Sequence, residues 1–547
     1  MTLTSRLHIP WHSTNVSAPT ATPILTASLG GPIITLTTLT TTVILLFFAA
    51  VVSAHVKPSK TKGKHVPLLN PKRWYELSTA RVRREYDADS WNITRQGMEK
   101  YNGEPFRLLT GELHDSEAVV LPTRYAEELK NDKRLSFTAL KKKGLHGTLP
   151  GFRTIGTLDQ ANRIVQMVTQ QDLTRSLPRL TSTLSAECAA VLDEVAGDAK
   201  EWHEIVVRSG ISLPTVARLS TLAFMGPETC QDREWIEIAI NFTVNLVLAN
   251  LVLQKYPRWI RPLANYCVSE CRLLQAQERR AMEIIDEKLA ARRRFREEEA
   301  SQGRGADAHP SDALDWFQSQ HQKLGGEYNP ALSQLVLSFA AIHTTADLLT
   351  QVILDLAVHQ EMIEPLRKEI IEALDGGPMD KMATHKMKLL DSVMKESQRM
   401  KPMQIAFMER GALEDVTLSD GIQIKRDTAT MIMPRMRDPT LYEKPDEYDG
   451  YRFYQLRQEA GNDKAAQLVS TTEDFMAFGF GNHACPGRFF AAHEVKMAMC
   501  HLLLKYDWKV ADEADPPKWR ANGNTLECDG LAKIAIRRRD AGVELPL

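Results

Sequence analysis

Charged side chains are missing from a long stretch near the N-terminus, since no Asp, Glu, Lys or Arg occurs between Ser13 and Ala54. Within it, residues 32–54 are apolar enough and long enough to cross a bilayer as one helix, which needs about 20 residues. Lysines follow at positions 57, 60, 62 and 64, and positive charge on that side predicts that the following chain lies in the cytosol. The predicted organisation is a lumenal tail at 1–31, a transmembrane anchor at 32–54, a basic and proline-containing hinge at 55–72 and one large body at 73–547.

A cleaved secretory signal is the alternative interpretation of this N-terminal stretch. Its late position, its length and the lack of a small-x-small cleavage pattern argue against cleavage. If the N-terminus is lumenal, Asn15-Val16-Ser17 is a glycosylation sequon.

Cysteine is scarce, with seven residues in a chain of 547. The odd number and sparse spacing suggest no disulfide framework, and they fit a reducing compartment for the body. Cys267 and Cys271 lie one helical turn apart and could hold a metal, although two ordinary helix residues are the more frequent explanation. The net charge of −1 gives no sign of a nucleic-acid partner, and no dinucleotide or Walker motif is present.

Helical periodicity dominates the body, and the strand-like runs are short. Apolar residues recur at helical spacing through most of residues 158–300, including a helix predicted at 232–253, and in a helix that begins near Asn329 and Pro330. Short strands are predicted at 106–109, 117–121, 405–410, 416–418 and 422–424. The sequence therefore predicts a mainly α fold with small β-sheets.

One glycine-rich loop, residues 478–488, reads Phe-Gly-Phe-Gly-Asn-His-Ala-Cys-Pro-Gly-Arg. Gly479 and Gly481 allow backbone angles that other residues avoid, so the chain can turn back tightly. The Pro-Gly pair marks the start of a helix, so Cys485 lies just before a helix N-terminus. There the free N–H groups favour a thiolate, a soft ligand that haem iron accepts axially. A buried free cysteine beside a turn is the alternative.

The loop fills the pattern Phe-x-x-Gly-x-x-x-Cys-x-Gly with Phe478, Gly481, Cys485 and Gly487. This pattern resembles the haem loop of the cytochrome P-450 family, the haem-thiolate monooxygenases. The resemblance implies the fold of that family and haem as the cofactor. It also implies Cys485 as the axial ligand of the iron, with Phe478, Gly479 and Gly487 as further residues of the haem-binding loop.

A second family motif lies upstream, at Lys-Glu-Ser-Gln-Arg in residues 395–399. Glu396 and Arg399 are three residues apart, so they share one face of a helix and can pair. Arg452 supplies a second guanidinium, and a carboxylate between two guanidiniums suits a buried structural lock. The resemblance implies that this triad supports the haem loop.

The third motif is Phe-Ala-Ala-Ile-His-Thr-Thr at residues 339–345. The resemblance places it in the helix that crosses the distal haem face and aligns Thr344 with the catalytic threonine, whose hydroxyl can hold a water and relay protons. His343 stands where the family usually has an acid, and histidine can also relay protons. A hydrogen-bonded core histidine is the equally weighted alternative. The Ala-Ala-Ile-His-Thr-Thr segment resembles that of fungal family members that oxidise terpenoids and related secondary metabolites.

The haem propionates need cationic partners. His483, two residues before the predicted ligand, is the preferred candidate, and Arg435 is another. The common Trp-x-x-x-Arg pattern is not found in the expected helix, so Arg163 or Arg175 is considered as a substitute.

By the same resemblance, the substrate walls come from residues 145–155, 235–260, 336–345, 403–408 and 522–526. Met403, Ile405, Phe407 and Met408 would give an adaptable apolar lining, although some of them could be ordinary core. We therefore expect a bulky lipophilic substrate, such as a terpenoid, which is oxidised with O₂.

Electrons must come from another protein, and the resemblance implies NADPH-cytochrome P-450 reductase on the same endoplasmic reticulum membrane. Arg488 and Lys496 are predicted to attract its acidic surface. Two alternatives stay open: a haem-thiolate isomerase or dehydratase that needs no O₂, and a non-catalytic, membrane-tethered haem-binding protein.

Overall fold

The computed structural model describes residues 41–43, 45–46, 66–76, 78–110, 117–302, 311–514 and 516–540. The chain divides into two units, residues 1–59 with 74–77 and residues 60–73 with 78–547. In the first unit, residues 41–43, 45 and 46 are helical and exposed. The rest of the predicted anchor, the sequon at Asn15 and most of the hinge lie outside the described residues, and these assignments stay predictions.

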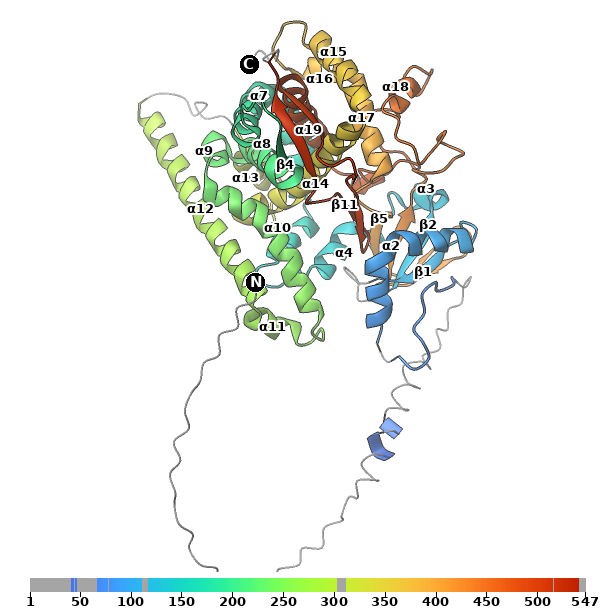
Figure 1. The fold of residues 1–547 in the computed structure, drawn as a ribbon. Helices are drawn as coiled ribbons and strands as arrows, with labels where there is room; N and C mark the ends of the chain where they lie inside the picture. Colours follow the sequence, from blue (N-terminus) through green and yellow to red (C-terminus); the bar gives the residue numbers. More distant parts are fainter. Residues whose placement is uncertain are drawn as a thin grey trace, which may run out of the picture. The chain divides into compact units, whose positions relative to one another are not determined.

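The larger unit is mainly helical, as the sequence predicts (Figure 1). Its α-helices are α2 (Ala80–Lys100), α3 (Ala126–Leu129), α4 (Phe137–Gly144), α5 (Arg153–Gly156), α6 (Ile164–Met167), α7 (Thr174–Ala196), α8 (Leu213–Met225), α9 (Pro227–Cys230), α10 (Arg233–Gln254), α11 (Arg261–Cys267), α12 (Ser269–Ser301), α13 (Ala313–Leu324), α14 (Pro330–Val358), α15 (Ile363–Leu374), α16 (Lys381–Lys386), α17 (Lys388–Met400), α18 (Arg452–Leu456) and α19 (Arg488–Lys505). The predicted helices at 232–253 and from 330 are confirmed as α10 and α14.

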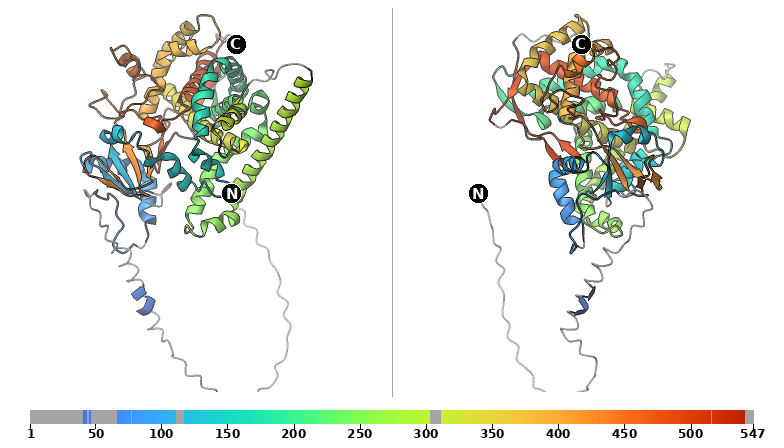
Figure 2. Two further views of the ribbon diagram at one scale, coloured as in Figure 1. Left: turned by 180° about the vertical axis from the view of Figure 1, so that it is seen from behind. Right: turned by 90° about the vertical axis from the view of Figure 1, so that its right-hand side faces the viewer.

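The strands form small sheets at the periphery of this helical body (Figure 2). A five-stranded sheet has the order β1-β2-β8-β5-β3, a three-stranded sheet has the order β4-β12-β9, and β6-β7 and β10-β11 are hairpins. Their bounds are β1 (Phe106–Leu109), β2 (Glu117–Pro122), β3 (Leu135–Ser136), β4 (His203–Val206), β5 (Phe407–Ala412), β6 (Val416–Thr417), β7 (Gln423–Ile424), β8 (Ala429–Met433), β9 (Tyr506–Val510), β10 (Arg520–Asn522), β11 (Thr525–Glu527) and β12 (Lys533–Arg538). The predicted strands are confirmed, with boundaries shifted by up to two residues.

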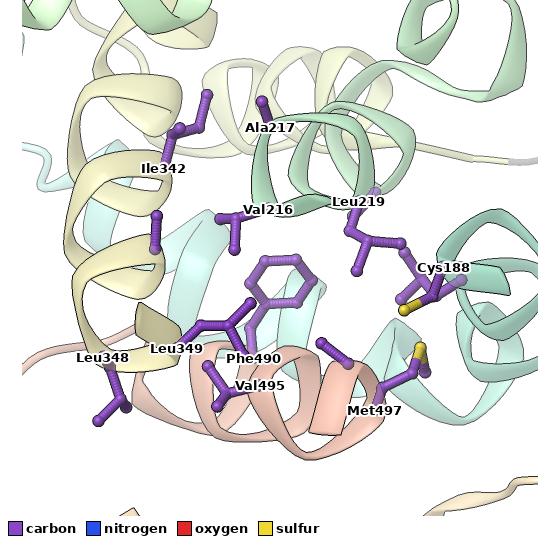
Figure 3. Close-up of a cluster of buried hydrophobic side chains, with 14 of the residues drawn as sticks. Cys188, Val216, Ala217, Leu219, Ile342, Leu348, Leu349, Phe490, Val495 and Met497 are labelled. Atoms are coloured by element: carbon purple, nitrogen blue, oxygen red, sulfur yellow. The ribbon is translucent and has the colours of Figure 1, made fainter. Parts of the chain in front are cut away.

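The centre of the core lies where α7, α8, α14 and α19 pack together (Figure 3). The ring of Phe490, near the start of α19, points toward Val216 on α8. Helix α14 starts where it does because the Asn329 side chain accepts a hydrogen bond from Leu332 N at 2.9 Å, which caps the free N–H groups of the first turn. Both α10 and α14 are long and apolar enough to cross a membrane, but two thirds of the most apolar stretch of α14 is buried inside the body.

The sequence does not predict β4, because a strand this short and half-exposed is recognisable only from its partner. That partner, β12, lies near the other end of the chain. Two stretches of π-helix, Val168–Leu173 and Arg208–Ser212, also escape prediction, since π-helical turns have no periodic signature of their own.

Candidate active site

The loop at 478–488 turns back on itself through two left-handed glycines. Gly479 has φ of +73° and Gly481 has φ of +71°, as the sequence predicts. The turn is closed by Cys485 N, which donates to Phe478 O at 2.7 Å. A Cβ atom at Gly481 would collide with the backbone oxygen of Lys130. The loop is therefore seated directly on the end of α3, and only glycine fits at that contact.

Cys485 lies at the start of α19, and the N–H groups of Gly487 and Arg488 point at its sulfur. Loss of solvation raises the pKa of the Cys485 thiol, whereas the predicted N–H groups and the charge of Arg488 lower this pKa by less. A bound iron ion adds the positive charge that completes this balance, because a coordinating thiol is deprotonated outright.

Arg488 holds the backbone around the cysteine in place. Its Nη1 donates to Cys485 O at 2.7 Å and its Nε donates to Val469 O at 3.1 Å. Since the guanidinium is planar, these two bonds fix the orientation of the Cys485 peptide relative to the preceding loop.

The predicted triad is present as two guanidiniums around one carboxylate. Arg399 on α17 donates to both oxygens of Glu396, at 2.7 and 2.8 Å. Arg452, at the start of α18, donates through Nε to the same oxygens at 3.1 and 3.2 Å. Asp449 N adds a bond at 3.0 Å. The triad joins α17 to the irregular chain that leads to the loop at 478–488.

Helix α14 exposes one short face within an otherwise buried stretch. Ala340 is exposed, whereas Ile342 and Thr345 are buried. Thr344 lies one turn after Ala340, and its hydroxyl donates to Ala340 O at 2.7 Å. Residues four apart share a helix face, so the predicted catalytic threonine lies on an accessible face of the core helix. A planar apolar ligand can approach the α14 backbone at Ala340, because the alanine side chain is only a methyl group.

His343 points to a neighbouring helix. Its Nε2 lies 2.8 Å from the backbone oxygen of Ile240 on α10. Burial lowers the pKa of His343, and the charge of Arg208 adds to this effect. The histidine is therefore neutral near pH 7 and hydrogen-bonded, as the alternative interpretation expects. The relay role stays a prediction.

Three cationic or basic side chains gather beside the loop. Burial is the main factor that lowers the pKa of His483 to about 4, and the charges of Arg410 and Arg163 lower it further. Arg163 Nη2 donates to Asn482 O at 3.2 Å. Arg410, at 3% exposure, has two buried nitrogens, Nε and Nη2, without a hydrogen-bond partner. Its third nitrogen, Nη1, donates to Glu409 O at 2.8 Å. Two unsatisfied nitrogens on a buried guanidinium are costly, so this group is suited to an anionic ligand.

Arg410 is not among the residues predicted from the sequence, although an arginine in a short, largely apolar strand was the available signal. Of the predicted candidates, Arg435 pairs with Asp438 at 2.8 Å and Asp474 at 3.4 Å, so its charge is already neutralised. Arg175 is exposed on α7. Of the predicted arginines, Arg163 lies against the loop at 478–488.

These observations fit a haem group. A thiol backed by N–H donors can ligate the iron, Arg410 and His483 can meet the propionates, and the Ala340–Thr344 face of α14 can cover the distal side. Cys485 is a soft sulfur ligand for iron, and Arg410 is a cation with two unsatisfied nitrogens. Haem offers a partner to each, the iron to the sulfur and a propionate to the guanidinium.

The predicted substrate strand is only partly available for substrate. Backbone hydrogen bonds join it to β11, with Leu526 N donating to Met403 O at 2.9 Å. Met403 is half-buried and Ile405 is buried beside this junction. Phe407 and Met408, by contrast, pack in the hydrophobic core between the sheet and the loop region. For these two residues the ordinary-core alternative holds.

The surface role predicted for Lys496 is wrong. Its side chain is buried, with Nζ 2.6 Å from Asp391 Oδ1 and a further bond to Thr384 O at 3.3 Å. Helix α19 is enclosed on all sides from Ala492 onward, so a lysine there is paired internally rather than offered to a partner protein.

Comparisons with known proteins agree with this site. Residues 118–526 match the family model described as Cytochrome P450. Cytochrome P450 monooxygenase hepE of Aspergillus oryzae is 39% identical over 87% of this chain and 86% of its own length. Cytochrome P450 monooxygenase eqxH of Fusarium heterosporum is 37% identical over 88% of this chain and 92% of its own.

Among solved structures, the cytochrome P450DA heme domain superposes with a TM-score of 0.66 at 15% identity, covering 88% of this chain and 99% of that one. At this identity the likeness concerns the fold alone. The family match and the fungal relatives, by contrast, show the family and the activity. The chain therefore belongs to the cytochrome P450 family and is a monooxygenase whose cofactor is haem with an axial cysteine thiolate.

Proposed function

We propose that this enzyme is anchored in the endoplasmic reticulum membrane, faces the cytosol and oxidises a lipophilic secondary metabolite of the terpenoid class. The observation that carries the substrate class is the character of the groups beside the catalytic face. Ala340 on α14 and Met403, which lies at the junction with β11, are accessible apolar residues that offer no hydrogen-bonding side chain. Such a lining favours a bulky apolar substrate.

Each site residue has a defined task in this proposal. Cys485 ligates the iron, and the Glu396–Arg399–Arg452 triad fixes the chain that leads to the ligand loop. Arg410 and His483 hold the propionates. Haem supplies the activation of O₂ for insertion of one oxygen atom into the substrate. The Thr344 hydroxyl, which donates to Ala340 O, accepts a hydrogen bond from a water through one of its lone pairs, and this water passes protons to the distal side.

Electrons come from a separate NADPH-cytochrome P450 reductase in the same membrane. The sequence carries no dinucleotide-binding motif, which supports an external donor. Arg488 is half-buried and committed to Cys485 O and Val469 O. These bonds hold the guanidinium in a fixed place and leave its charge unchanged, since carbonyl oxygens are neutral, so Arg488 can still attract an acidic partner surface.

The test uses full-length protein and the reductase in phospholipid vesicles, with NADPH, isotopically labelled O₂ and a panel of terpenoid precursors. The proposal expects NADPH consumption and a product that carries one labelled oxygen atom. A rearranged or dehydrated product without label would indicate the isomerase or dehydratase. No product and no NADPH consumption with any precursor would indicate a non-catalytic haem-binding protein.

A further inference from the structure

Helix α10 is apolar on both its inner and its outer side. Trp235, Phe242 and Leu246 are buried against the body, whereas Val244, Val247, Leu248 and Leu251 are exposed. Hydrophobic contact is non-directional. In the second half of α10 apolar residues thus face both the body and the solvent, so hydrophobic contact there favours no single rotation about the helix axis. The orientation of α10 against α14 must therefore be set by directional contacts.

The described residues show such contacts on two neighbouring helices. Toward α12, Arg280 pairs with Glu234 at 2.6 Å, and Asn245 donates to Gln277 at 3.0 Å. Toward α14, His343 Nε2 meets Ile240 O at 2.8 Å. The contact from α14 is made by the residue directly before Thr344, so it links α10 to the catalytic turn.

The chemistry of this contact fixes the state of the histidine. A carbonyl oxygen can only accept, so Nε2 carries the hydrogen and donates it. Ile240 is in the interior of α10, where its carbonyl also accepts the helix bond, and a carbonyl has two lone pairs for these two donors. A histidine whose Nε2–H is committed to a backbone carbonyl is not free to deliver that proton.

We propose that His343 is a positioning residue that ties α10 to α14 beside Thr344, and that it is not a proton relay. The hydrogen bond sets how α10 lies across the distal side and so controls how readily ligands enter and leave. This inference rests on the proposed function, since it assigns a task within the same site.

The experiment compares variants that keep or remove the donor. Glutamine places its Nε at the same number of bonds from Cβ as His343 Nε2, so H343Q keeps a donor but cannot exchange charge. H343L removes the donor and leaves Ile240 O with its own helix bond, so it strands no polar group. T350V is the matched control, because Thr350 donates only within α14, to Ala346 O at 2.7 Å.

Amide hydrogen exchange of peptides from residues 233–254 is measured by mass spectrometry, together with the dissociation rate of 4-phenylimidazole and peroxide release during NADPH turnover. We expect H343L to raise exchange in α10 and the dissociation rate by about fivefold, as for the loss of one net hydrogen bond. H343Q and T350V should remain at the wild-type values in all three measurements.

Unchanged amide exchange in α10 of H343L would overturn the proposal that His343 ties α10 to α14. So would an H343Q protein that has wild-type exchange but releases more peroxide than the wild type, because that result assigns proton transfer to the imidazole. Haem content and product formation by the wild-type enzyme test the proposed function separately, since exchange in α10 is measured whether or not a substrate is found.

Discussion

Arg399 donates hydrogen bonds to both carboxylate oxygens of Glu396, with Nε 2.7 Å from Oε2 and Nη2 2.8 Å from Oε1. Both side chains have 0% exposure. The same carboxylate also faces Arg452, so two guanidiniums share one counter-charge. The fold is therefore sensitive to loss of the carboxylate, which both guanidiniums share.

Glu396→Gln should destabilise the protein by about 3–5 kcal/mol, because it leaves the buried guanidinium of Arg399 and the half-buried guanidinium of Arg452 without a counter-charge. Urea unfolding followed by circular dichroism measures the change, and the fraction of purified protein that contains haem should fall with it. Glu447→Gln is the control, since that side chain is exposed and pairs only with exposed Lys444; it should stay within about 0.5 kcal/mol of wild type. A loss below about 1 kcal/mol in Glu396→Gln would show that the triad is not a structural lock.

Arg410→Gln should weaken haem retention. A hydrogen bond to a charged group contributes about 1.5–3 kcal/mol, which corresponds to faster haem loss by roughly 10- to 150-fold. Transfer of haem to excess apomyoglobin measures this rate. Arg435→Gln is the comparison, because Arg435 is already paired with Asp438 and should leave the rate unchanged. Equal rates for both variants would mean that Arg410 does not meet a propionate.

Thr344→Ala should divert reducing equivalents to peroxide, since the hydroxyl that holds the distal water is removed. Proton-transfer groups typically contribute 10²- to 10⁴-fold, so we expect product formed per NADPH to fall on the order of tenfold or more. Thr344→Ser keeps the hydroxyl and should retain most of the coupling. Wild-type coupling in Thr344→Ala would remove this residue from the mechanism.

Asp355, near the end of α14, gives the fold a specific pH dependence. Burial is the main cause that raises the pKa of Asp355 to about 6, while contacts with Ser397, Gln351, His359 and Lys401 lower it by less. A carboxyl whose folded pKa lies above its unfolded value of 3.8 favours folding when protonated. The contribution of Asp355 to the free energy of unfolding therefore declines as the pH rises from about 4 to about 6. Above about pH 6 the ionised carboxylate destabilises the folded state by its full amount.

Asp355→Asn removes this titration. We expect the variant to gain stability relative to wild type as the pH is raised from 5 to about 7, measured as the difference in denaturation midpoint at each pH. A difference that stays constant over this range would show that Asp355 is already ionised at pH 5 in the folded protein.

The sequence predicts those parts of the site that depend on spacing along the chain. The loop at 478–488 and the Glu396–Arg399 pair are local patterns, and both have the expected geometry. Arg410 was missed because its importance depends on which groups surround it after folding, and two of its nitrogens find no partner there.

The error at Lys496 has its physical origin in the energy of burial. Lys496 is charged but enclosed, since Asp391 from α17 meets it inside the core. This pairing cannot be derived from one stretch of sequence, because burial is set by elements that are distant along the chain.

The central claim is that Cys485 is the thiolate ligand of the haem iron, and the reduced carbon-monoxide difference spectrum of Cys485→Ser tests it most directly. We expect the wild type and the control Cys267→Ser, whose cysteine is exposed on α11, to give the band of a thiolate-ligated haem. Cys485→Ser should lose that band even where haem remains bound. Retention of the thiolate band in Cys485→Ser would contradict the account, because another residue would then hold the iron.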